Sequence, residues 1–99
     1  MPKLHLTVAT PQKLIVQEEV DEVIAPGAQG YFGVLPAHTA FLTELKAGDI
    51  SYRIDDKKHI LWISGGYCEV LEEKVTILAH KARPPAESKK PEKEAAEKS

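Results

Sequence analysis

Residues 59–79 read His59-Ile60-Leu61-Trp62-Ile63-Ser64-Gly65-Gly66-Tyr67-Cys68-Glu69-Val70-Leu71-Glu72-Glu73-Lys74-Val75-Thr76-Ile77-Leu78-Ala79. This segment holds three short runs of strand-forming residues, at 59–64, 67–71 and 75–79. Two glycines separate the first pair of runs and a charged triplet separates the second pair, and both kinds of segment favour turns. The runs predict consecutive β-strands, because helices are usually longer, at about ten residues or more.

The same period of two residues occurs elsewhere in the chain. Leu4, Leu6 and Val8 alternate with polar or small residues, which places three apolar side chains on one face of a strand. Residues 50–54 alternate in the same way, whereas residues 41–46 fit one helical turn as well as a strand. Turn-forming groups recur about every 8 to 16 residues. The pattern predicts an all-β fold, an antiparallel β-sandwich of about ten short strands in two sheets.

The size and charge of the chain exclude several classes of protein. Its 99 residues make one domain, because two would each fall near the ~40-residue size below which a core needs disulfides or metals. A net charge of -2 offers no basic surface for nucleic acid or for an anionic membrane. No apolar stretch approaches the ~20 residues of a spanning helix, and no signal peptide is recognisable. The single Cys68 is typical of a reducing compartment, so the cytosol is expected.

The composition changes after Ala82. Residues 83–99 contain no Val, Ile, Leu, Met or aromatic residue, and they include three of the seven prolines. Such a segment cannot bury enough apolar surface to offset the entropy lost on ordering. We therefore expect a sandwich domain at 1–82 and a short, charged, mostly disordered tail at 83–99.

Two groups of residues suggest catalysis at first sight. Cys68 could act as a nucleophile with a histidine, but it lies in an apolar run, where a free cysteine is usually a small hydrophobic residue. General acid–base catalysis needs a desolvated carboxyl group, whereas the acidic residues are expected in a solvated turn or an edge strand. These acidic residues are Glu18, Glu19, Asp21 and Glu22. No catalytic residue is predicted.

Metal and phosphate sites are not predicted either. The four histidines lie at least 21 residues apart, which does not match zinc-ligand spacing. Gly27, Gly30 and Gly33 recur every third residue, but a phosphate loop needs a helix start after its glycines. Here a strand that ends at Pro36 follows, so the glycines are expected in a tight turn and a bulge. The default function is binding, without a metal or a cofactor.

Three linked motifs resemble one protein family. The first is Gly30-Tyr31-Phe32-Gly33-Val34-Leu35-Pro36-Ala37-His38-Thr39-Ala40-Phe41-Leu42-Thr43, which is similar to a signature of the epsilon subunit of F-type rotary ATP synthases. Residues 46–50 resemble the turn that follows in that family, and 63–70 with 75–79 resemble the strands that close its N-terminal domain. The resemblance covers residues 3–82 and implies two packed five-stranded sheets.

The resemblance implies a non-catalytic rotor subunit of the central stalk. In this family the sandwich binds the gamma subunit and rests its lower loops on the membrane c-ring, so that proton or sodium flow is coupled to ATP synthesis. The implied gamma contacts are His38, Thr39, Phe41, Leu42 and Thr43. The implied c-ring contacts are Ala28, Gln29, Gly30 and Tyr31. Tyr31 departs from the small or acidic residue common there, and Phe41 and Leu42 fit a hydrophobic core equally well.

The C-terminal part of the chain departs from the family. Most members continue into an α-helical hairpin that restrains ATP hydrolysis and in some bacteria binds ATP, whereas a proline-containing tail begins here at Arg83. We expect a short-form epsilon subunit without hairpin-based inhibition, ATP binding or direct membrane insertion. The resemblance implies a peripheral place on the cytoplasmic face of the bacterial inner membrane. An alternative, a stand-alone carbohydrate-binding module, would use exposed Trp62, Tyr31 or Tyr52 as a stacking platform.

Overall fold

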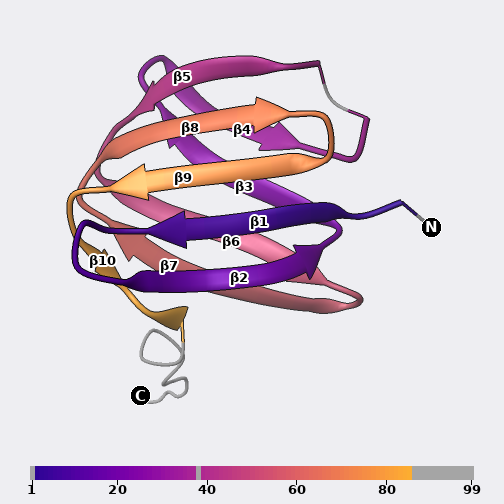
Figure 1. Ribbon diagram of the computed structural model, residues 1–99, viewed down its shortest axis with the longest axis horizontal. Coiled ribbons are helices and arrows are strands. Elements are labelled where there is room, and N and C mark those ends of the chain that lie inside the picture. Colours follow the sequence, from indigo (N-terminus) through magenta and orange to yellow (C-terminus); the bar gives the residue numbers. More distant parts are fainter. Residues whose placement is uncertain (1, 38, 86–99) are drawn as a thin grey trace.

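The computed structural model describes residues 2–37 and 39–85, and the regular elements of these residues are ten β-strands (Figure 1). They are β1 (Leu4–Ala9), β2 (Leu14–Val20), β3 (Glu22–Gly27), β4 (Gly30–Val34), β5 (Phe41–Leu45), β6 (Gly48–Ile54), β7 (Lys57–Ile63), β8 (Gly66–Leu71), β9 (Lys74–Ala79) and β10 (Ala82–Arg83). The ambiguous segment 41–46 forms strand β5, because every residue from 41 to 45 finds a partner on β8. The predicted tail enters β10 at Arg83, and its residues 86–99 lie outside the described part of the chain.

The strands form two layers, as the alternating pattern predicts. The β6 layer holds β10, β7, β6, β3 and β4 in that order, and the β9 layer holds β5, β8, β9, β1 and β2 (Figure 1). A single residue pair, Gly27 with Leu45, connects β3 to β5 and joins the layers into one hydrogen-bonded path. The predicted all-β sandwich is confirmed.

The hydrophobic core lies between the layers and follows from the alternation. Leu4, Leu6 and Val8 of β1 are fully buried, and so are Ile50 of β6 and Leu61 of β7. Burying one such aliphatic side chain contributes about 1.5–3 kcal/mol. Among the described residues no polar or charged side chain is buried, so the core is held by apolar packing alone.

One strand pair departs from the antiparallel prediction. β1 pairs with β9 in parallel, from His5 opposite Lys74 to Ala9 opposite Leu78, whereas the other described pairs are antiparallel. Parallel neighbours cannot be joined by a tight turn. The turn signals that predict hairpins therefore carry no information about this contact.

The acidic residues at 18–22 are divided among the edge strand β2, the junction that follows it and the first position of β3. Glu18 and Glu19 belong to β2, which ends the β9 layer, and this confirms the edge-strand alternative. Asp21 follows β2, and its carboxylate lies 2.8 Å from the Lys3 ammonium. The same carboxylate accepts a hydrogen bond of 2.8 Å from the backbone N–H of Asp55. These contacts join the N-terminal segment to the β6–β7 turn.

The loops at one end of the sandwich are held together by the backbone. This end contains the β3–β4 loop at 28–29, the β5–β6 turn and the β7–β8 turn, and it lies opposite the N-terminus (Figure 1). The N–H of Ala28 donates to the carbonyl of Glu44 (3.1 Å), and the N–H of Lys46 donates to the carbonyl of Pro26 (2.8 Å). We call this end the hairpin end.

Candidate functional site

The hairpin end contains a hollow of about 370 Å3. Its lining residues are Gly27, Ala28, Gln29, Gly30, Tyr31, Phe32 and Thr43. All four residues of the implied c-ring contact are among them, together with Thr43 of the implied gamma contact. Gly30 is needed in this turn because its φ of +130° is a conformation that favours glycine. The structure therefore brings the residues of the implied c-ring contact together at one end of the sandwich, with Thr43 beside them.

The side chain of Tyr31 borders this hollow and is 61% exposed. Its strand partner is Pro26 of β3. A Cβ atom on Gly48 would lie 2.9 Å from the Tyr31 hydroxyl oxygen and 3.3 Å from Pro26. The ring therefore extends from β4 across β3 toward β6, and the absence of a side chain at Gly48 makes room for it.

The residues implied in the gamma contact begin before β5 and continue along it. Thr39 is exposed ahead of the strand, and Thr43 is half-buried within it. The Thr43 hydroxyl donates a hydrogen bond to the carbonyl of Glu44 (3.4 Å). His38 lies outside the described residues.

Phe41 and Leu42 point to opposite faces of β5. The ring of Phe41 packs against Phe32 in an edge-to-face arrangement, with centroids 5.5 Å apart and an angle of 78° between the planes. Phe41 thus packs against the core, while Leu42 is 70% exposed on the outer face of the β9 layer. Of the two, only Leu42 is freely available to a partner on that face.

An apolar strip crosses the outer face of the β9 layer near the hairpin end, and sequence reasoning missed it. Tyr67 lies opposite Leu78, Leu78 opposite Ala9, and Ala9 opposite Leu14. Tyr67, Leu78 and Leu14 are each more than half exposed. Leu42 lies on the diagonal to Tyr67, two residues from its direct partner, which is within reach of a long side chain. We call these five residues the outer apolar strip.

A second hollow, of about 300 Å3, lies beside the outer apolar strip. Its lining residues are Ala9, Thr10, Pro11, Tyr67, Leu78, Ala79 and His80. The strip and the hollow come from strands that are distant in sequence, and one of the pairings is the parallel pair β1–β9. The strand register, and no local motif, is the signal that would reveal them.

Cys68 lies in an environment that suits packing. It is fully buried, and burial raises the pKa of its thiol to about 12. A thiol with so high a pKa is a poor nucleophile, because the thiolate is the reactive form. Within residues 2–37 and 39–85, no three His, Cys, Asp or Glu side chains gather closely enough to hold a metal ion. The same ranges contain no helix long and apolar enough to cross a membrane.

The aromatic platform of the carbohydrate-binding alternative does not form as expected. Tyr52 is only 5% exposed, since it shares the inner face of β6 with Ile50, and its ring stacks on His59 at 5.2 Å. Trp62 is half-buried, and the guanidinium of Arg83 lies 5.0 Å from the centre of its ring. The expectation that Tyr52 is exposed is therefore wrong, and a cation occupies one face of the tryptophan.

These features define the class of the protein, a small β-sandwich with exposed apolar residues on one outer face and a hollow at one end. The chain belongs to the family described as ATP synthase, Delta/Epsilon chain, beta-sandwich domain, which matches residues 3–85. The match includes all ten strands. The resemblance drawn from the three motifs is confirmed.

Bacterial relatives agree with this family. The chain is 49% identical over 79 residues to the ATP synthase epsilon chain of Nitratidesulfovibrio vulgaris (strain DP4), across 80% of this chain and 59% of the relative. It is 51% identical over 77 residues to the ATP synthase epsilon chain of Syntrophobacter fumaroxidans (strain DSM 10017 / MPOB), across 78% of this chain and 58% of the relative. The chain thus spans less than two thirds of the length of these relatives.

Solved structures support the same fold. A chain of the Euglena gracilis mitochondrial ATP synthase, in the OSCP/F1/c-ring assembly in rotational state 1, superposes with a TM-score of 0.79 at 28% identity, across 85% of this chain and 54% of that chain. A chain of the Tetrahymena thermophila mitochondrial ATP synthase central stalk/c-ring gives a TM-score of 0.71 at 16% identity, across 98% and 78% respectively. The second likeness concerns the fold alone.

Proposed function

We propose that this chain is a non-catalytic rotor subunit of an F-type ATP synthase, which connects the gamma subunit to the c-ring and so couples ion flow to ATP synthesis. The family match over residues 3–85 supports the assignment. The observation on which the proposed function rests is the outer apolar strip, because a contiguous exposed apolar patch marks an interaction site. In this role the chain acts as part of a membrane complex, held peripherally on its cytoplasmic face.

The gamma subunit docks on the outer face of the β9 layer. Leu42, Tyr67 and Leu78 all point to that side, and covering one such side chain contributes about 1.5–3 kcal/mol. Phe41 supports this contact from the inner face of β5, because its packing on Phe32 holds the strand against the core. Thr39 precedes β5, and Thr43 lies on the same face of β5 as Phe41, so these two threonines border the contact made by Leu42.

The c-ring contact lies at the hairpin end. Ala28 and Gln29 form the exposed β3–β4 loop, and the backbone bonds of Ala28 and Lys46 fix this loop to the β5–β6 turn. A loop held in this way transmits force between partners with little deformation. Tyr31 borders the loop and adds aromatic surface to its β6-layer side.

The gamma contact is tested by isothermal titration of the chain into isolated gamma subunit. Leu78→Ser removes a strip residue, and Leu35→Ser removes a leucine of similar exposure that lies outside the β9 layer. We expect Leu78→Ser to weaken binding by about tenfold or more and Leu35→Ser by less than about twofold. Equal losses in both variants, or no binding by a chain with native circular dichroism, would contradict the docking surface.

The c-ring contact is tested on the assembled gamma subunit, chain and detergent-solubilised c-ring. Ala28→Trp places a large ring in the exposed loop, where it disturbs no core residue. This variant should reduce the amount of gamma–chain complex that stays with the c-ring, while its titration into isolated gamma stays unchanged. Full retention on the c-ring would place that contact elsewhere.

We expect no ATP binding by the sandwich domain at residues 1–82. After Gly30 the chain enters strand β4, so no helix N-terminus follows the glycines to receive a phosphate. Calorimetric titration with magnesium ATP should show no saturable heat at micromolar concentration. A saturable signal would disprove this part of the proposal.

A further inference from the structure

Strand β4 is an edge strand that lacks the usual protection against pairing with another chain. It ends the β6 layer, and β3 is its only partner among the described strands. Charged residues and proline normally protect such an edge. The strands at the other layer ends carry charges, namely Arg83 in β10, Glu18 and Glu19 in β2, and Glu44 in β5. β4 reads Gly30-Tyr31-Phe32-Gly33-Val34 and contains neither a charged residue nor a proline, so its edge is open to pairing.

Pro26 of β3 fixes the direction of the backbone groups on β4. Pro26 lies opposite Tyr31 and has no N–H, so these two residues do not exchange hydrogen bonds. The Pro26 carbonyl instead accepts a bond of 2.8 Å from the N–H of Lys46, on the side of β3 that faces away from β4. Because directions alternate along an antiparallel strand, the N–H and C=O groups of Tyr31 and Gly33 point to the free edge, whereas those of Phe32 point to β3.

The free edge of β4 is accessible. Among the residues that the structure describes, none forms a hydrogen bond with the edge groups of Tyr31 and Gly33. Both residues are exposed, and the ring of Tyr31 extends across β3 toward Gly48, away from the edge. Phe32 points inward, where its ring packs on Phe41. Another strand can therefore approach the backbone of β4 directly.

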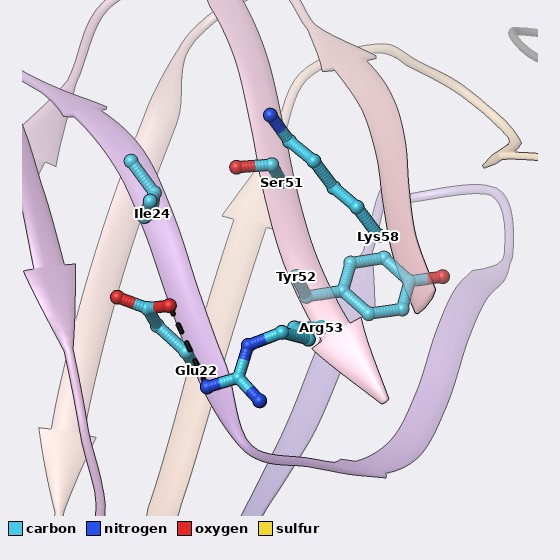
Figure 2. Close-up of a pocket in the computed structure, with 6 residues that line it drawn as sticks. All are labelled: Glu22, Ile24, Ser51, Tyr52, Arg53 and Lys58. Atoms are coloured by element: carbon cyan, nitrogen blue, oxygen red, sulfur yellow. Dashed lines mark ion pairs between the residues drawn. The ribbon is translucent and has the colours of Figure 1, made fainter. Parts of the chain in front are cut away.

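No contact within the described chain requires glycine at position 33. Its φ is negative, and the β3–β4 register passes through it without a bulge. A Cβ atom there would meet its nearest neighbour, Glu22, at an ordinary 3.7 Å. On the outer face Gly33 lies opposite Ile24, whose side chain lines a hollow of about 190 Å3 (Figure 2). A strand glycine without a bulge is typical of a place where another backbone approaches closely.

We propose that the free edge of β4 pairs with the same edge of a second copy of this chain. In an antiparallel pairing about a two-fold axis at Phe32, Tyr31 of one copy lies opposite Gly33 of the other. Both residues direct their N–H and C=O groups to the edge, so they exchange two hydrogen bonds, and the axis repeats this pair. The register opposes no like charges, because β4 contains none.

The inference concerns the chain by itself and does not rest on the proposed function. A small interface made of a few backbone hydrogen bonds is typical of transient complexes, so we expect a reversible dimer. One consequence does rest on the proposed function. Tyr31 belongs to the proposed c-ring contact, so a paired chain must separate before it binds the c-ring.

The pairing is tested with the full chain, labelled with nitrogen-15, from about 10 micromolar to about 1 millimolar. Sedimentation velocity should show monomer giving way to dimer across this range. The amide hydrogens of Tyr31 and Gly33 should exchange about threefold or more slowly at the highest concentration, because only the dimer bonds them. Phe32 is the internal control, since its N–H bonds to β3 in both states and should exchange at one rate throughout.

Three substitutions at one position separate the hydrogen bond from other effects. Gly33→Pro removes an edge N–H, and proline is tolerated on an edge strand where its nitrogen faces solvent, so it should weaken the dimer by about tenfold or more. Gly33→Lys adds a protective charge and should have a similar effect, which provides a second route if the proline variant does not fold. Gly33→Ala keeps the N–H and should change the dimer affinity by less than about threefold.

Three results would overturn the proposal. One is a chain that stays monomeric at about 1 millimolar. Another is a dimer that persists in folded Gly33→Pro and Gly33→Lys, since another surface would then hold it. The last is a dimer that is lost in Leu78→Ser while the Tyr31 and Gly33 amides exchange freely, because the outer apolar strip would then be the interface. The amide spectrum of each variant reports whether it is folded, and binding to gamma is measured separately.

Discussion

At the scale of single residues, Gly66 is the position where a side chain is least tolerable. A Cβ atom there would overlap the backbone carbonyl of Leu78 and would lie 2.8 Å from the Cα atom of Ala79. The backbone of β9 cannot move away without breaking its pairing with β8. We therefore expect Gly66→Ala to lower the free energy of unfolding by about 2–4 kcal/mol, measured by urea titration.

Gly33 provides the matched control for that substitution. A Cβ atom at Gly33 would meet its nearest neighbour, a Glu22 carboxylate oxygen, at 3.7 Å, which is ordinary contact. Gly33→Ala should change stability by less than about 0.5 kcal/mol. Similar losses of stability in the two variants would show that strand propensity in general, and not the close approach of β9, makes substitution of Gly66 unfavourable.

The buried thiol of Cys68 predicts how stability depends on alkaline pH. Its pKa is raised from 9.0 to about 12 by burial in the folded state. Below pH 9.0 the thiol is protonated in both the folded and the unfolded state, so its contribution to the stability of the fold is fully present. Between pH 9.0 and about 12 only the unfolded state loses the proton, and stability falls by about 1.4 kcal/mol per pH unit.

The variant Cys68→Ala isolates this contribution from other groups that titrate in the same range. At neutral pH the variant should be less stable than the unmodified chain, because a buried side chain is shortened. The difference should shrink as pH rises above 9.0, because only the unmodified chain is destabilised by thiol ionisation. Urea titrations at a series of pH values test this, and a difference that stays constant would rule it out.

At the scale of elements, the Asp21 contacts fix the β2–β3 junction to the N-terminal segment and the β6–β7 turn. The hydrogen bond from Lys3 is the main reason why the pKa of Asp21 lies below its usual 3.8. A carboxylate whose pKa is lowered by folding stabilises the folded chain at pH values above the pKa of the unfolded state. This stabilisation is lost as the pH falls through the pKa of the folded state. This contribution should therefore disappear at acidic pH, below about 4.

Asp21→Asn tests that element-scale contact. The substitution keeps the shape of the side chain but removes the charge, so the variant should lose less stability than the unmodified chain as the solution is acidified. Asp56→Asn, at an exposed position in the same β6–β7 turn, is the control and should follow the unmodified chain. Thermal midpoints across the acidic range provide the measurement. Identical acid dependence in all three proteins would exclude the role of Asp21.

Strand positions could be predicted from the sequence because alternation is a local property. Leu4, Leu6 and Val8 show their common face without any knowledge of neighbouring strands. Partners and direction are not local, so the parallel pairing of β1 with β9 could not be predicted. For β5, adjacent Phe41 and Leu42 left the buried face undecided until pairing with β8 and packing on Phe32 fixed it.

The candidate site shows the same difference between what is local in the sequence and what depends on strand pairing. The four residues of the implied c-ring contact are contiguous in sequence, so the resemblance to one family loop was enough to group them, and the structure brings them together at one hollow. The outer apolar strip draws Ala9, Leu14, Tyr67 and Leu78 from four strands. Each of these residues resembles an ordinary core residue in the sequence. Only the register shows that they share an exposed face.

At the scale of the whole molecule, the arrangement of the two layers separates the proposed contacts from each other. The proposed gamma contact lies on the outer face of the β9 layer, and the proposed c-ring contact lies at the hairpin end. The outer faces point in opposite directions because the core occupies the space between the layers. A partner on the outer face of the β9 layer therefore leaves the side chains on the outer face of the β6 layer uncovered.

The layers share one core, and this predicts that they unfold together. Among the described strands, the pair Gly27–Leu45 alone connects the layers along the hydrogen-bonded path, so their cohesion depends on apolar packing between the inner faces. Leu6 is fully buried in β1 of the β9 layer, and Leu6→Ala should lower the free energy of unfolding by about 2–5 kcal/mol.

Trp62 belongs to the β6 layer and reports on that layer through its fluorescence. If unfolding is cooperative, Leu6→Ala should move the urea midpoints of Trp62 fluorescence and far-ultraviolet circular dichroism by the same amount. A Trp62 midpoint that stayed in place while the dichroism midpoint fell would mean that the layers unfold separately.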